Sequence, residues 1–215
     1  MKKILFTLQL LAFMFSTALV YGQYDPKAKS ILDAMNKKYR DFPAFKANFS
    51  CTLSSPEGAD DTFEGEITVK DNKYRLNLGQ QEVYNDLSTV WTLFKEEQEV
   101  TITTFEKDPE DLLPSDIFDI YKEGFKYVFV EEKKIEGKTY EIVELSPEDT
   151  DLKFYKIRLE IAKNDKTLRS YDMYEKGGRI YKYKITNFTP KSNVADSYFV
   201  FNAKEYPDVE VIDLR

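Results

Sequence analysis

Apolar and polar residues alternate with a period of two through most of this chain, and this pattern restricts its fold more than any other feature. Between residues 45 and 53 every second residue is apolar and the residues between them are polar. Such alternation is typical of a strand with one buried face, and short connections join antiparallel neighbours. The pattern predicts a mainly β chain with about ten or eleven antiparallel strands. Further alternating runs lie at 67–69, 74–78, 155–161 and 181–185, and turn signals such as Glu136-Gly137 and Gly177-Gly178 separate the runs.

Two segments carry helical signals instead. Asp25 can cap a first turn, and Pro26 suits the first helical position. Apolar residues then recur every three or four positions, which predicts an amphipathic helix over 25–41. A second group of start signals lies at 108–116, and a glycine at 124 provides the stop. These signals predict a short helical pair over about 109–122, inserted into an otherwise all-β chain.

The composition excludes several classes of function. The 38 acidic residues outnumber the 31 lysines and arginines, so the chain lacks the positive charge that nucleic-acid backbones require, and no nucleic-acid partner is expected. There is no histidine, which removes Ser-His-Asp and Cys-His nucleophilic systems and histidine-ligated zinc. Cys51 is the only cysteine, so no intramolecular disulfide can form. We expect no metal and no cofactor, and we expect Cys51 to point inward as a small hydrophobe.

Residues 1–22 have the layout of a secretory signal peptide. Two lysines precede an apolar stretch from Ile4 to Val20, and Val20 and Gly22 supply small residues before the expected cut. A membrane anchor is the alternative, because a stretch of about 17 residues reaches the lower limit for a span. No cysteine stands at the expected cut, so lipid attachment there is not predicted. The mature chain, 23–215, contains no linker or repeat and is predicted to be one soluble, exported domain.

The apolar face of the predicted sheet needs a cover. A strongly curved sheet with the helices at 25–41 and 109–122 over its mouth satisfies this need. Inward aromatic rings leave gaps against one another, so we predict an apolar cavity, with a solid core as the alternative. Opening such a lid costs on the order of 5 kcal/mol, and an acyl chain would recover about 0.8 kcal/mol per methylene. The predicted acyl-chain-binding residues are Phe45, Phe49, Tyr74, Leu76, Trp91, Leu113, Ile117, Phe118, Tyr127, Phe129, Tyr155, Ile157, Leu159, Tyr181 and Tyr183.

Several segments, in order, resemble the LolA family of periplasmic outer-membrane lipoprotein carriers. The segment 44–49 after the first helix is similar to the family's first strand, and 65–75 is similar to its second and third strands. Asp86 to Trp91 resembles the family's Asp-Gly-Lys-x-Leu-Trp stretch, and 199–213 resembles its C-terminal signature. The resemblance covers nearly the whole mature chain. It implies an open antiparallel β half-barrel whose helices form a lid.

The resemblance also implies a function. A member of this family shields the acyl chains of lipoproteins in its cavity and carries them through the periplasm. Its partners would be acylated lipoproteins, an inner-membrane lipoprotein-releasing ABC transporter and, if present, an outer-membrane receptor, and the chain would be a monomer without enzyme activity. Two positions depart from the family pattern. Asp71 stands where the family often has an arginine that affects lid closure, and Leu87 replaces the glycine of the Asp-Gly-Lys stretch.

Three other functions fit parts of the same pattern. The scaffold could bind a free lipid or a glycolipid, which would appear in a periplasmic pull-down in place of lipoproteins. It could bind peptides at a sheet edge. A carboxylate-driven glycosidase would need two inward acids about 5–10 Å apart, whereas the acidic residues here fall on predicted turns and outer faces. The carrier hypothesis therefore leads.

Overall fold

The computed structural model describes residues 24–106, 116–191 and 193–215. The predicted signal peptide and Leu113 lie outside the described residues. The described chain forms a single curled sheet of 12 strands, so the predicted antiparallel, strongly curved sheet is confirmed. The strands are β1 (Ala44–Ser54), β2 (Asp61–Lys70), β3 (Lys73–Leu78), β4 (Gln81–Asn85), β5 (Thr89–Phe94), β6 (Glu99–Thr104), β7 (Phe125–Ile135), β8 (Lys138–Pro147), β9 (Phe154–Ala162), β10 (Leu168–Glu175), β11 (Ile180–Lys191) and β12 (Glu210–Asp213).

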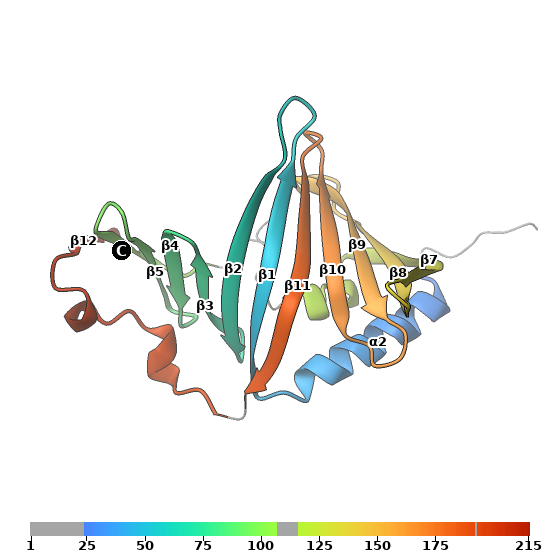
Figure 1. Cartoon of the computed structure of the whole chain (residues 1–215), viewed down its shortest axis with the longest axis horizontal. Coiled ribbons are helices and arrows are strands. Elements are labelled where there is room, and N and C mark those ends of the chain that lie inside the picture. Colours follow the sequence, from blue (N-terminus) through green and yellow to red (C-terminus); the bar gives the residue numbers. More distant parts are fainter. Residues whose placement is uncertain (1–23, 107–115, 192) are drawn as a thin grey trace, which may run out of the picture.

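The order of the strands shows how the chain builds this sheet. From β1 the strands follow one another outward to β6, and the chain re-enters the sheet at β7, the opposite edge. It then returns strand by strand to β11, which pairs with β1. The last strand, β12, pairs in parallel with β6, whereas the other neighbours are antiparallel. The sheet therefore has β1 and β11 near its middle and β12 and β7 at its edges (Figure 1).

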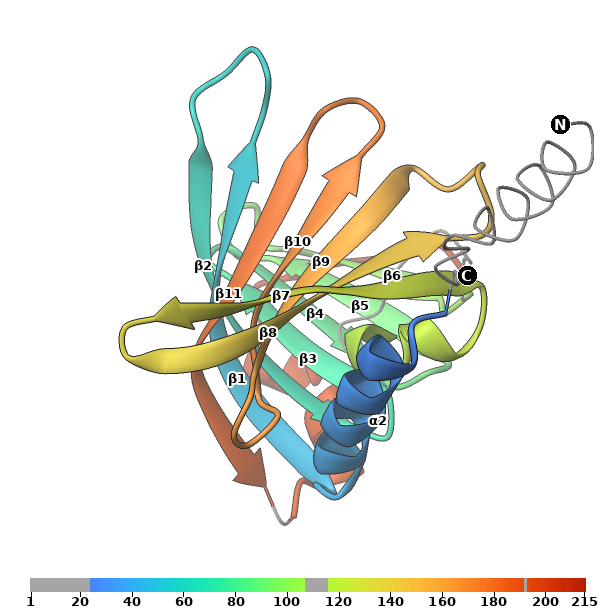
Figure 2. The ribbon, with the colours of Figure 1, turned by 90° about the vertical axis from the view of Figure 1, so that its right-hand side faces the viewer.

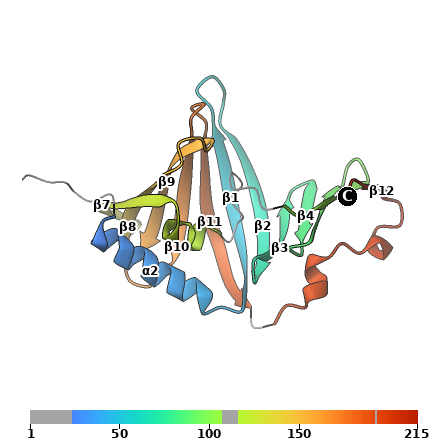
Figure 3. The ribbon, with the colours of Figure 1, turned by 180° about the vertical axis from the view of Figure 1, so that it is seen from behind.

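The predicted N-terminal helix is present as α2 (Pro26–Arg40). The side chain of Asp25 accepts a hydrogen bond from the backbone N–H of Lys27 at 2.8 Å, and Pro26 occupies the first turn. Lysines and an arginine fill the last turn, where the helix dipole favours cations. The helix lies on the inner side of the curled sheet, across β8 to β11 (Figures 2 and 3). Its buried face is made of Ala28, Ile31, Leu32, Met35, Asn36 and Tyr39.

The described part of the second predicted helical segment consists of two short 3-10 turns, η1 (Asp116–Phe118) and η2 (Ile120–Lys122). The predicted start of this segment near 109 lies outside the described residues. Side chains of α2 hold the two turns in place. Asn36 Nδ2 donates to the carbonyl oxygen of Phe118 at 3.0 Å, and the Tyr121 hydroxyl donates to Asp33 at 2.7 Å.

The C-terminal segment covers part of the other face of the sheet, a role that the sequence did not suggest. It contains two 3-10 turns, η3 (Asp196–Phe199) and η4 (Ala203–Glu205). Phe201 and Tyr206 form a small second core with Tyr84, Leu93 and Val100. This core fixes the segment against β4 to β6 before the chain pairs as β12 (Figure 1).

The main core lies between α2, the turns η1 and η2, and the inner face of the sheet. Its centre is aliphatic and dry, with Val143, Leu145, Ile157, Leu159 and Ile161 all 0% exposed. Each of these side chains lies on β8 or β9. Among the described residues, no helix has the length and apolar character that a membrane crossing requires.

Candidate functional site

An apolar cavity of about 1000 Å³ lies on the inner face of the sheet, beside the solid core. Its volume is at the upper end of the roughly 300–1000 Å³ that small-molecule sites occupy. The wall is built mainly by β1, β2, β3, β10 and β11, and Ile117 and Phe118 from η1 close one side. The cavity is thus lined chiefly by the middle strands of the sheet.

Register explains why four strands present apolar groups at the same level of this wall. Cys51 on β1 faces Phe63 on β2 and Tyr183 on β11, and Tyr183 faces Tyr171 on β10. All four residues line the cavity. Side chains alternate between the two faces along each strand. The residues two positions before and after each member of this row therefore also face inward. The wall is therefore continuous across the sheet.

An aromatic cluster closes the end of the cavity nearest α2. Phe118 stacks on Tyr39 with ring centroids 3.9 Å apart, and Phe45 lies edge-on to Phe118 at 5.7 Å. Phe188 lies 5.3 Å from both Phe45 and Tyr39. The Tyr39 hydroxyl accepts from the backbone N–H of Leu168 at 3.0 Å, and burial raises the pKa of Tyr39 to about 12. The phenol stays neutral, so this end of the cavity carries no charge.

Polar groups in the middle of the wall are also neutral. Burial raises the pKa of the Cys51 thiol, although a hydrogen bond with Tyr183 opposes the shift. Burial likewise raises the pKa of Tyr171 and Tyr183 well above the ordinary range. A thiol held in this form is a poor nucleophile. The centre of the cavity can therefore bury hydrocarbon without burying a charge.

A close approach between two strands shapes the wall at Phe49. Phe49 on β1 is paired with Gly65 on β2. A Cβ atom added at Gly65 would come within 2.4 Å of the Phe49 ring. The missing side chain of Gly65 therefore lets this ring lie flat along the neighbouring strand, where it lines the cavity.

The structure brings about half of the predicted site residues together. Two of them come from η1. The others come from separate alternating runs, and the register of the sheet decides whether the residues of these runs face the same space. Whether they bind an acyl chain stays a prediction. The predicted residues on the cavity wall are Phe45, Phe49, Tyr74, Leu76, Ile117, Phe118, Tyr181 and Tyr183.

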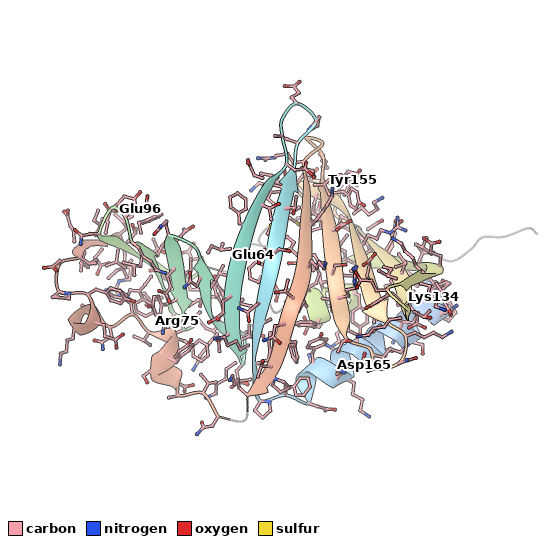
Figure 4. All side chains as sticks on the ribbon, in the orientation of Figure 1. Glu64, Arg75, Glu96, Lys134, Tyr155 and Asp165 are labelled. Atoms are coloured by element: carbon pink, nitrogen blue, oxygen red, sulfur yellow. The ribbon has the colours of Figure 1, made fainter. Side chains whose placement is uncertain are left out.

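Two predicted residues, Trp91 and Tyr155, do not face the cavity, and the expectation for them was wrong. Trp91 packs against the second core on the other face, and its neighbour Val90 lines the cavity. Both residues are apolar, so alternation could not choose between them. Tyr155, labelled in Figure 4, is 50% exposed, because an irregularity in the pairing of β9 with β10 puts Phe154 inward in its place.

The remaining four predicted residues are buried in or against the solid core. Ile157 and Leu159 are fully enclosed on β9. Tyr127 lies edge-on to Tyr121 of η2 at 6.1 Å, and Phe129 lies under the Lys27 ammonium, which is 3.4 Å from its ring centroid. These side chains face inward as predicted, but α2 and the 3-10 turns cover them, and they do not line the cavity.

Sequence reasoning missed several wall residues. Tyr171 and Met173 alternate on β10, and that pattern was available in the sequence. Phe188 was hidden, because it follows Ile185 by three residues and simple alternation would turn it outward. A register shift between β1 and β11 restores its inward position.

Comparisons with known proteins agree on the fold. The model of the family described as outer membrane lipoprotein carrier protein LolA matches residues 40–202. No curated protein matches this chain. An uncharacterized conserved protein from Thermus thermophilus shares 12% identity, with a TM-score of 0.57 over 87% of this chain and 99% of that chain. LprF from Mycobacterium bovis also shares 12% identity, with a TM-score of 0.51 over 81% of this chain and 98% of that chain.

Proposed function

The chain belongs to the LolA family, described as outer membrane lipoprotein carrier proteins, and from that premise we propose that it carries acylated lipoproteins through the periplasm. The acyl chains of the cargo would occupy the inner cavity, and the polypeptide of the cargo would remain outside. The single observation that carries this proposal is the apolar cavity of about 1000 Å³ on the inner face of the sheet.

Energetics support this use of the cavity. Burying ten methylenes of an acyl chain is worth about 8 kcal/mol, before the cost of ordering the chain. The wall offers Phe, Tyr, Leu, Ile and Met side chains to such a chain. Of its charged residues, Lys153 and Glu106 are exposed, and Glu175 is paired with Arg179 at 2.8 Å. Binding of this kind needs no chemical step, so we propose a carrier and not an enzyme.

The route of the cargo follows from the family and from the first 22 residues. We propose that residues 1–22 direct export and are removed, and that the mature chain acts as a monomer in the periplasm. It would receive lipoproteins from an inner-membrane lipoprotein-releasing ABC transporter. It would then deliver them to the outer membrane, through a receptor if one is present there.

A binding experiment with neighbouring variants tests the proposal. Met173 lines the cavity, and the next residue, Tyr174, packs against Tyr155 on the outer face. Met173→Glu would place a carboxylate in the path of the acyl chain, and Tyr174→Glu would add the same charge outside. We expect the purified mature protein to retain a triacylated lipoprotein, and Met173→Glu to weaken retention at least tenfold while Tyr174→Glu does not.

Two controls make the result decisive. The same lipoprotein without its acyl chains should not be retained, and equal retention of both forms would contradict the proposal. A fatty acid or glycolipid retained in preference to the lipoprotein would replace the proposed cargo with a free lipid.

A further inference from the structure

A second pocket, here called the outer pocket, lies on the opposite face of the sheet from the cavity and has a volume of about 850 Å³. Its floor is the outward row Lys46, Thr68, Arg75 and Tyr84, in which each residue faces the next across β1 to β4. The C-terminal segment forms its walls with residues between 193 and 205. Because Phe45 and Ala47, the neighbours of Lys46, line the cavity, the sheet separates the two sites.

Arg75 is held in one position within the outer pocket. Its Nε atom donates to Glu82 at 2.6 Å, and its guanidinium carbon lies 4.5 Å from the ring of Tyr84 and 4.7 Å from the ring of Tyr198. Glu82, whose side chain is 8% exposed, also pairs with Lys95 at 3.5 Å. These contacts fix the guanidinium through one nitrogen and its flat surface. Its two terminal nitrogens make no hydrogen bond to any described residue.

Two lysines add charge beside this arginine. Lys191 lines the outer pocket, and its side chain makes no ion pair or hydrogen bond to any described residue. Lys46 lies two strands from Arg75, about 9–10 Å along the sheet, and pairs with Glu66 at 2.7 Å. Glu205 is the one acidic residue among the described lining residues, and its carboxylate accepts from Asn202 at 2.8 Å. Among the described residues, three cationic side chains and one carboxylate therefore line the pocket, and the carboxylates of Glu66 and Glu82, which pair with Lys46 and Arg75, lie outside the lining.

From this geometry we propose that the outer pocket binds a phosphate group. A guanidinium with two free nitrogens in a fixed plane suits two oxygens of an oxyanion. Two cations on the floor of the pocket and a third from Lys191, with the hydroxyls of Thr68 and Ser197, suit a tetrahedral group with three or more oxygens and nearly two charges. The volume exceeds that of a single ion, so the phosphate of a polar headgroup and free phosphate are the two sources to distinguish.

Calorimetric titration of the mature protein with three ligands tests this proposal: glycerol 3-phosphate, inorganic phosphate and acetate. We expect at least one phosphate ligand to bind at least tenfold more tightly than acetate. Tighter binding of glycerol 3-phosphate supports a headgroup, and tighter binding of inorganic phosphate supports the free ion. If neither phosphate binds at millimolar concentration, or if acetate binds as tightly, the proposal is overturned.

Three variants show whether the binding occurs in the outer pocket. Arg75→Lys keeps a positive charge beside Glu82 but removes the planar fork, and Lys191→Gln removes a cation without a structural partner. Each should weaken phosphate binding about tenfold. Lys184→Gln, at an exposed position of the same strand as Lys191, should not change it. Phosphate binding that survives both pocket variants would overturn the proposal. Retention of lipoprotein should stay normal in all three variants, so this test and that of the carrier function can fail separately.

Discussion

The two parts of the inner face are built from the same alternation but do different things. On β8 and β9 the inward residues are aliphatic, lie under α2 and are fully buried. On β1, β3, β10 and β11 many inward residues are aromatic, remain partly exposed and surround a cavity. Branched aliphatic side chains interdigitate, whereas flat rings meet at edges and leave space. The difference indicates that the solid part supports the fold and the open part is available for a ligand.

The largest expected effect comes from making the same substitution, leucine to alanine, once in the solid part and once in the open part. Leu159→Ala removes a side chain that is 0% exposed within the solid part and should lower the free energy of unfolding by about 2–5 kcal/mol. Leu76→Ala removes the same atoms beside the cavity, where they have fewer neighbours, and should cost only about 1 kcal/mol. Urea denaturation of both variants measures the two losses. Equal losses of unfolding free energy would show that Leu76 is packed as tightly as Leu159, which would contradict a cavity beside it.

A second prediction concerns the contact that holds η1 at the boundary between the two parts. Asn36→Ala leaves the buried carbonyl of Phe118 without its donor and also removes the acceptor of the Lys122 ammonium. The loss should be about 1–3 kcal/mol. Hydrogen exchange should become faster at residues 117–122, because these turns depend on α2. Asn187→Ala, at an exposed position of β11, is the matched control, and an equal effect there would remove the special role of Asn36.

A third prediction concerns the tight turn after β4, in the open part. Leu87 has a φ of 73°, a left-handed conformation that costs a residue with a side chain about 1–2 kcal/mol. The LolA family has glycine at the corresponding place, so Leu87→Gly should raise stability. Glycine loses more chain entropy on folding, which leaves a net gain of about 0.5–1 kcal/mol. Leu87→Ala should give no such gain, and thermal unfolding of the two variants compares them.

The smallest effect is a pH dependence of stability at Asp33, which accepts the hydrogen bond from Tyr121 that holds η2 against α2. Hydrogen bonds from Lys29 and then Tyr121 lower the pKa of Asp33 below its ordinary value of 3.8. Because the folded pKa is below the unfolded one, the contribution is present above pH 3.8 and is lost as the pH falls through the folded pKa. Asp33 is 48% exposed, so solvent screening keeps this contribution below about 1 kcal/mol. In Asp33→Asn the unfolding midpoint should lose this part of its acid dependence, and an unchanged acid dependence would contradict the assignment.

Local signals in the sequence were sufficient to predict α2 and most of the strands. Asp25, Pro26 and the spacing of the apolar residues predicted α2, because capping and helical period act over neighbouring residues. Period-two alternation predicted the sheet for the same reason. The short β12 and its parallel pairing with β6 were not predicted, since they depend on contacts between segments more than 100 residues apart.

The candidate site was less predictable, because it depends on register and irregular pairing. Alternation identified Tyr181 and Tyr183 correctly, but an irregularity turned Tyr155 outward and another turned Phe188 inward. That a side chain points inward also did not show whether it lines the cavity or lies in the solid core. Leu159 and Leu76 both face inward, yet only the coverage by α2 and the 3-10 turns decides that Leu159 is enclosed.

Cys51 allows the most direct test of the central claim that the cavity holds acyl chains. It is the only cysteine of the chain, it lies on the cavity wall, and it is 7% exposed. The measurement is the rate at which iodoacetamide alkylates Cys51, with and without a triacylated lipoprotein. We predict that the acylated cargo slows alkylation at least tenfold and that the same cargo without acyl chains leaves the rate unchanged. An unchanged rate with the acylated cargo would contradict the account.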